Sequence, residues 1–137
     1  MPFKILIVDD DRNLRLALGQ IFSAYTVLTA AEGEAALRLM AVERPAIVLL
    51  DLEMPGMSGL DVLAAIKGLD YKPAVFMLTG NENLEMALKA LELGAKSYIT
   101  KPFTVADIRR IVLSGLKENG GAEKPDARSW TVKKEGA

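Results

Sequence analysis

The sequence predicts an α/β fold in which helices cover both faces of a parallel, doubly wound five-stranded sheet. Five short apolar runs alternate along the chain with five amphipathic segments. The apolar runs are continuous rather than alternating, as expected for parallel strands that are covered on both faces. A repeated β–α alternation of this kind indicates a parallel central sheet.

The five predicted strands are the apolar runs at residues 5–8, 25–28, 46–50, 74–78 and 98–99. The second and fifth runs are the weakest in apolar character, which suits the two edges of a sheet. Between the runs, Leu14, Leu18 and Ile21 recur at helical spacing, as do Leu84, Leu88 and Leu91. Further helices fit residues 33–43, 58–68 and 104–117, and prolines at 45 and 73 mark two turns toward strands.

Composition narrows the chemistry that this chain can support. With 137 residues, the chain suits one compact domain with a real hydrophobic core. Its 17 basic and 18 acidic residues give a formal charge of −1, which argues against nucleic-acid or membrane binding driven by net charge. It contains neither cysteine nor histidine, so a bound metal must be a hard cation held by oxygen. The sequence shows no signal peptide and no long apolar segment, so we expect a cytoplasmic protein.

The composition changes after about residue 117. Residues 118–137 are polar, charged and glycine-containing, and we expect a flexible tail or linker that follows a domain at residues 1–117. The tail contains Trp130, the only tryptophan of the chain. A flexible tail with one isolated aromatic is favoured over a docking segment.

Polar residues end four of the five predicted strands. The acidic triplet Asp9-Asp10-Asp11 follows the first strand, Asp51 the third, Thr79 the fourth and Lys101 the last. Because ligands of parallel sheets bind at the carboxyl ends of the strands, these side chains are expected to form one site. Asp11 is better placed as an N-cap or first-turn residue of the first helix.

Clustered carboxylates resist joint ionisation unless a cation lies among them, and Mg²⁺ fits an all-oxygen site. A carboxylate can itself accept a phosphoryl group, with Mg²⁺ and a lysine ammonium neutralising the charge. The residue types therefore predict phosphorylation of an aspartate.

Four motifs resemble those of receiver domains of bacterial response regulators, including the single-domain chemotaxis-type receivers of two-component signalling. They occur in the family's order and at similar spacing within residues 3–117: Val8-Asp9-Asp10, residues 50–59 (LDLEMPGMSG), Leu78-Thr79-Gly80 and Lys101-Pro102-Phe103. The resemblance implies a flavodoxin-like sheet in the strand order 2-1-3-4-5. It also implies a cis peptide bond between Lys101 and Pro102.

The resemblance assigns roles around a bound Mg²⁺ ion. Asp51 would be the phosphoacceptor, and Asp10, Asp51 and the backbone carbonyl of Glu53 would ligate the metal directly. Asp9 would act through a bound water, and Lys101 would contact the phosphoryl oxygens.

The resemblance also implies a conformational switch. The hydroxyl of Thr79 would move onto the phosphoryl group and allow Tyr98 to rotate inward. Glu53 and Asn81 occupy positions that flank the phosphoryl group and are expected to tune its lifetime.

The expected donor is a sensor histidine kinase or a phosphotransfer protein, and the expected output surface is residues 83–117. The domain would act either on a separate downstream protein or on an output domain that is not part of this chain.

We do not expect it to be an enzyme beyond its own phosphorylation and dephosphorylation. A phosphatase with an aspartate nucleophile is disfavoured because residues 51–55 (DLEMP) lack the usual Asp-x-Asp. A receiver that works without phosphorylation is disfavoured because Asp10, Asp51 and Lys101 are all present.

Overall fold

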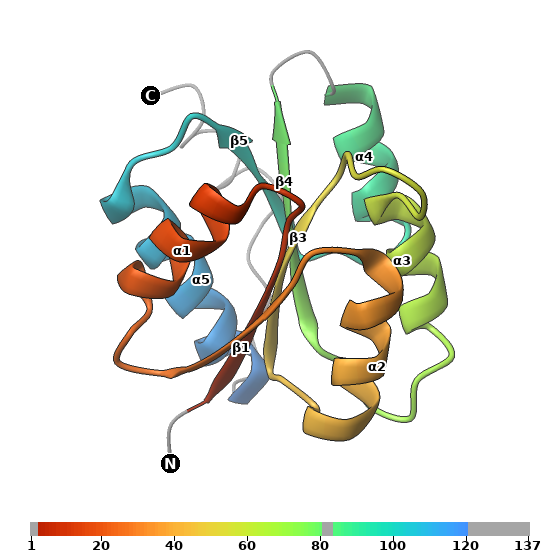
Figure 1. The fold of residues 1–137 in the computed structure, drawn as a ribbon, viewed down its shortest axis with the longest axis horizontal. Helices are drawn as coiled ribbons and strands as arrows, with labels where there is room; N and C mark the ends of the chain where they lie inside the picture. Colours follow the sequence, from red (N-terminus) through yellow and green to blue (C-terminus); the bar gives the residue numbers. More distant parts are fainter. Residues whose placement is uncertain (1–2, 81–83, 121–137) are drawn as a thin grey trace.

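The computed structural model describes residues 3–80 and 84–120 as alternating strands and helices around one parallel sheet (Figure 1). In chain order, these are β1 (Lys4–Val8), α1 (Arg12–Ile21), β2 (Thr26–Ala30), α2 (Gly33–Glu43), β3 (Ile47–Asp51), α3 (Gly59–Ile66), β4 (Ala74–Gly80), α4 (Leu84–Glu92), β5 (Ser97–Lys101) and α5 (Val105–Gly120).

The strand order is β2-β1-β3-β4-β5, and all four neighbouring pairs are parallel. This confirms the doubly wound sheet and the predicted order. The central strand β3 is buried along its whole length, whereas β2 is the least buried strand and lies at an edge. The weak apolar character of the second run therefore reflects its edge position.

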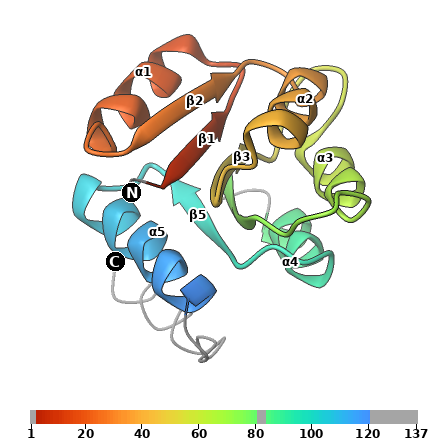
Figure 2. The ribbon, with the colours of Figure 1, turned by 90° about the horizontal axis from the view of Figure 1, so that it is seen from below.

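Helices pack on both faces of the sheet, with α1 and α5 on one face and α2, α3 and α4 on the other (Figures 1 and 2). Alternate residues of each central strand enter different cores. Leu49 and Phe76 face α1 and α5, where they meet Leu18 and Val112. Val48, Leu50 and Met77 face the three other helices. The core beside α2, α3 and α4 has only aliphatic side chains among its buried residues, whereas the core beside α1 and α5 also contains Phe22 and Phe76.

Several predicted element ends are shifted. β2 lies at 26–30 instead of 25–28, and β5 extends over 97–101 instead of 98–99, because the hydrogen-bonded ladders with β1 and β4 include residues whose side chains are polar. Asp51, Thr79 and Lys101 are consequently within their strands rather than after them. The helix predicted at 58–68 spans 59–66, and Ser58 caps it reciprocally with Asp61.

The last helix, predicted at 104–117, spans Val105–Gly120. Residues 118–120 of the predicted tail thus belong to α5. Residues 121–137, Trp130 included, lie outside the described residues, so the domain boundary at residue 117 stays a prediction. In the described part of the chain, no helix is long and apolar enough to cross a membrane.

Candidate functional site

The carboxyl edge of the sheet brings three acidic residues together. Asp9 and Asp10 follow β1 directly, and Asp51 ends β3, the neighbouring strand. One carboxylate oxygen from each of these residues lies within 4.8 Å of the others. Asp9 and Asp51 are only 1% and 5% exposed, whereas Asp10 is exposed. The predicted acidic cluster is therefore formed by the fold and opens to solvent on the Asp10 side.

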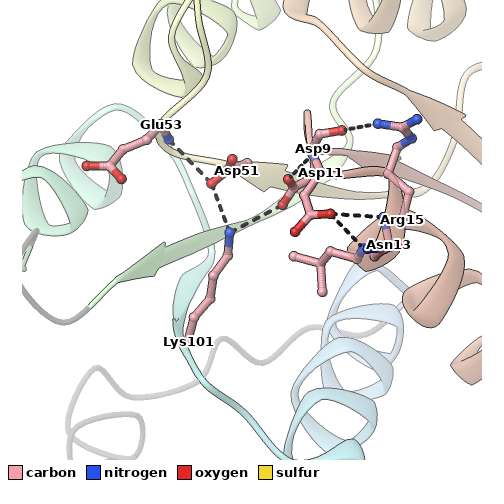
Figure 3. Close-up of polar contacts among 8 residues, drawn as sticks. Asp9, Asp11, Asn13, Arg15, Asp51, Glu53 and Lys101 are labelled. Atoms are coloured by element: carbon pink, nitrogen blue, oxygen red, sulfur yellow. Dashed lines mark hydrogen bonds and ion pairs between the residues drawn. The ribbon is translucent and has the colours of Figure 1, made fainter.

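Lys101 of β5 contacts two of these carboxylates. Its Nζ lies 3.3 Å from Oδ2 of Asp9 and 3.3 Å from Oδ1 of Asp51 (Figure 3). Two residues that are 92 positions apart in the chain thus meet because β1 and β5 end at the same edge of the sheet. The predicted cis peptide bond between Lys101 and Pro102 is present.

Asp9 is held by contacts from its own loop, from α1 and from β5. Its Oδ1 accepts a hydrogen bond from the amide of Asp11 at 2.9 Å, while Oδ2 contacts Lys101. The Arg15 guanidinium donates to the backbone carbonyl of Asp9 at 2.7 Å (Figure 3). Asp11 accepts from the amides of Asn13 and Leu14, which confirms it as the N-cap of α1. These contacts fix the loop that presents Asp9 and Asp10.

Asp51 is positioned by the loop that follows it. The amide of Glu53 donates to Oδ1 of Asp51 at 3.4 Å, and the Glu53 carboxylate points away from both Asp51 and Lys101 (Figure 3). At the start of α3, a Cβ atom on Gly59 would collide with the backbone carbonyl of Asp51. Only glycine therefore allows α3 to begin so close to the acidic cluster.

The charges of this cluster are strongly coupled. The pKa of Asp51 is raised to about 6, first because burial penalises the carboxylate and then because the Asp9 charge repels it. Lys101 and the Glu53 amide act in the opposite direction. Burial also disfavours the Lys101 ammonium, but the attraction of Asp51 and Asp9 outweighs it, so the pKa of Lys101 is raised. The cluster thus carries more negative charge than its single lysine balances.

The predicted switch residues lie on the adjacent strands. Thr79 is 1% exposed, and its hydroxyl donates to the carbonyl of Gly80 at 3.2 Å rather than to Asp51. Tyr98 is half-buried on β5 beside Met77 of β4 and packs against the core on the α4 face. Asn81, the second predicted tuning residue, lies outside the described residues.

Two residues of the site were missed by the sequence reasoning. Arg15 lies one turn into α1, and nothing in the spacing of its neighbours indicates that it reaches back to Asp9. Gly59 stands in the motif at 50–59, but its role depends on the approach of α3 to Asp51, which is visible only in three dimensions.

Comparison with known proteins decides the family. The sequence model of the response regulator receiver domain matches residues 5–113 of this chain. The chain belongs to this family. As a receiver domain, it is a component of two-component signalling and functions as a signalling switch.

Relatives of this receiver domain differ in length. It is 40% identical over 114 residues to sporulation initiation phosphotransferase F of Bacillus subtilis, covering 82% of this chain and 92% of that protein. It is 33% identical over 133 residues to response regulator MprA of Mycobacterium sp. strain KMS, covering 96% of this chain. The chain spans only 58% of the length of MprA. These relatives give no support to the chemotaxis-type subclass suggested by the motifs.

Solved structures agree with the fold. A response regulator receiver domain from Clostridium thermocellum superposes with a TM-score of 0.81 at 30% identity, covering 86% of this chain and 97% of that one. The receiver domain of NtrX from Brucella abortus gives a TM-score of 0.78 at 31% identity, with 82% and 98% covered. In the longer NtrX structure the similarity covers 28% of that chain, so in NtrX this fold is one part of a larger protein.

Proposed function

We propose that this receiver domain accepts a phosphoryl group on the carboxylate of Asp51. The observation that carries the proposal is the position of Asp51: it is buried, ends the central strand, and is flanked by Asp9 and Asp10 on one side and by the Lys101 ammonium on another. A carboxylate oxygen would attack phosphorus, and the bond from phosphorus to the donor would break. The donor would keep the bonding electron pair, and Asp51 would become an acyl phosphate.

The chemistry of the donor atoms fits Mg²⁺. Three carboxylates within 4.8 Å of one another offer hard oxygen ligands, and the chain has no histidine or cysteine to favour a softer metal. Asp10, Asp51 and the backbone carbonyl of Glu53 would hold the ion, with Asp9 acting through water. The bound ion would neutralise negative charge on the acceptor and on the incoming phosphoryl group.

The remaining site residues would either stabilise the phosphorylated Asp51 or respond to its phosphorylation. Lys101 already contacts Asp51, so its ammonium is placed to balance the added charge. The Thr79 hydroxyl would leave the Gly80 carbonyl and donate to the phosphoryl group, and Tyr98 would move inward in response. Glu53 and Asn81 would tune the lifetime of the phosphoryl group.

The donor would be a sensor histidine kinase or a phosphotransfer protein. The output would be read on α4, β5 and α5, where the exposed apolar side chains of Leu84, Leu88 and Val105 offer contact area. The partner would be a separate protein or an output domain, and the relatives include both a protein of similar length and the longer MprA. The domain would catalyse only its own phosphorylation and dephosphorylation.

Intact mass after incubation with acetyl phosphate tests the proposal. We expect one phosphoryl adduct that requires both Mg²⁺ and Asp51, so that EDTA and Asp51→Asn each abolish it. An adduct that persists in Asp51→Asn would place the acceptor elsewhere. Absence of an adduct on the wild-type chain, with both acetyl phosphate and a phosphorylated kinase, would overturn the proposal.

A further inference from the structure

A pocket opens at the end of the sheet opposite to Asp51. It has a volume of about 360 Å³ and lies between the end of α3, the start of β4 and the turn after α4. Figure 2 is viewed from this end and shows α3 and α4 side by side. Val75 of β4 lines the pocket and lies four positions before Thr79, roughly 13 Å along the extended chain. The pocket is therefore distinct from the acidic cluster.

The floor of this pocket is apolar. Leu63 and Ile66 of α3 and Val75 of β4 line it, and all three are buried side chains of the core on this face. Leu93 adds a partly buried side chain from the turn after α4. A volume above about 300 Å³ with an apolar floor is typical of sites for small organic ligands.

The rim of the pocket is basic. Lys67, Lys72 and Lys96 line it, and among the described residues that form the pocket none is acidic. The Nζ atom of Lys72 contacts the backbone carbonyl of Lys67 at 3.3 Å, which brings this ammonium back toward the end of α3. Several ammonium groups around an apolar floor complement a molecule with a charged head and an apolar body.

From these features we infer that the pocket binds a small amphiphilic anion. Its apolar body would lie against Leu63, Ile66 and Val75, and its carboxylate or phosphate would face the three lysines. A peptide or a membrane surface fits less well, because the pocket is compact. The inference does not depend on phosphorylation of Asp51.

Binding of 8-anilinonaphthalene-1-sulfonate to the full chain provides a direct test. We expect saturable fluorescence with one site, weakened by added salt. The uncharged analogue N-phenyl-1-naphthylamine should bind at least about 5-fold more weakly, because it cannot use the lysines. Amide chemical shifts should change at Val75, Leu93, Gly94 and Lys96.

Matched variants separate this pocket from other apolar surface. The triple variant Lys67→Gln, Lys72→Gln, Lys96→Gln should bind the probe at least about 5-fold more weakly. Lys89→Gln on the exposed face of α4 should bind like wild type, and Asp51→Asn should too. Circular dichroism checks that each variant is folded, and a single Lys67→Gln variant replaces the triple one if that fails.

Four results would overturn the inference. The first is equal binding of the charged and uncharged probes, and the second is unchanged binding in a folded lysine variant. The third is a set of shift changes confined to Leu84 and Leu88 on α4. The fourth is displacement of the probe by inorganic phosphate alone at the same concentration as an amphiphilic anion, because the apolar floor would then contribute nothing.

Discussion

The ammonium of Lys101 lies 3.3 Å from a carboxylate oxygen of Asp51 and at the same distance from one of Asp9. One lysine thus holds two buried carboxylates that would otherwise repel each other across the carboxyl edge of the sheet. The arrangement is compact, but it leaves the cluster with a net negative charge when Asp9, Asp10 and Asp51 are ionised. This imbalance is what a divalent cation would relieve.

Replacing Lys101 should slow phosphorylation of Asp51 far more than it weakens folding. In Lys101→Gln, the acceptor loses the positive charge beside it, and we expect the rate with acetyl phosphate to fall by about 10²–10³-fold. Intact-mass time courses at saturating Mg²⁺ measure the rate. Lys89→Gln, an exposed lysine on α4, is the control and should react at the wild-type rate. A rate within twofold of wild type in folded Lys101→Gln would remove Lys101 from the reaction.

The raised pKa of Asp51 predicts a pH-dependent gain of stability in Asp51→Asn without metal. In the folded protein the pKa of the Asp51 carboxyl is about 6, above its ordinary value of 3.8. Between pH 3.8 and pH 6, Asp51 is therefore mostly protonated in the folded chain and mostly ionised in the unfolded chain. The charged form of Asp51 therefore destabilises the wild type above about pH 6, and this cost disappears as the pH falls toward 4.

We expect the Asp51→Asn substitution to stabilise the metal-free protein by about 1–3 kcal/mol at pH 7.5 and by much less at pH 4.5. Urea unfolding of both proteins in EDTA at several pH values measures the difference. Asp70→Asn, which removes a surface aspartate paired with Arg44, serves as the control. A difference that is constant from pH 4.5 to 7.5 would contradict the raised pKa.

The sequence predicted the parallel sheet and the acidic cluster because both follow from one-dimensional signals, whereas the strand order followed from the resemblance of the motifs to receiver domains. Continuous apolar runs indicate strands that are covered on both faces, and the motif residues occupy the ends of those runs. The helix and strand ends were less accurate. Residues such as Asp51 and Lys101 are polar yet pair within the sheet, and hydropathy alone assigns them to loops.

What the sequence could not predict depends on contacts between distant segments. The bond from Arg15 to the Asp9 carbonyl requires the orientation of α1 relative to the loop before it. The basic pocket combines Lys67 and Lys72 of the α3–β4 connection with Lys96 of the α4–β5 connection, and these lysines share no spacing pattern. Such features need the packed fold before they can be recognised.

Mg²⁺ should stabilise the folded protein through the acidic cluster. At a concentration 100 times its Kd, the ion should add about 2.7 kcal/mol to the free energy of unfolding. Asp10→Asn should lose most of this gain, because Asp10 is the exposed carboxylate of the cluster. Thermal unfolding with and without Mg²⁺ measures the effect, and EDTA should reverse it. The control is Asp107→Asn on α5, which should respond to Mg²⁺ like wild type.

Arg15 should act as a positioning residue for the metal site. Its guanidinium donates to the Asp9 carbonyl at 2.7 Å, so Arg15→Gln should loosen the loop that presents Asp9 and Asp10. We expect about 3–10-fold weaker Mg²⁺ binding, or about 0.7–1.4 kcal/mol, because only part of the free energy of this charge-assisted hydrogen bond is transmitted to the metal site. Phosphorylation at saturating Mg²⁺ should change little, which distinguishes positioning from direct participation. Arg12→Gln, an exposed residue on the same helix, is the control. Unchanged Mg²⁺ affinity in Arg15→Gln would show that the loop keeps its shape without this contact.

Gly59 should be one of the least replaceable residues near the acceptor. In Gly59→Ala, the added methyl group would meet the carbonyl of Asp51 and the backbone of Leu52, neither of which can rotate away. α3 or the end of β3 must therefore shift, at a cost of about 1–3 kcal/mol in the free energy of unfolding. Gly68→Ala is a close control, because its methyl group would make only an ordinary contact with the carbonyl of Ala65.

Urea unfolding compares the two alanine variants, and Mg²⁺ titration shows whether the shift reaches Asp51. We expect Gly59→Ala to lose both stability and Mg²⁺ affinity, because its clash is with the backbone of the residue that ends β3. Equal stability of the two variants would mean that α3 can move away from Asp51 freely. In that case, the close approach of α3 would not be what holds the acceptor in place.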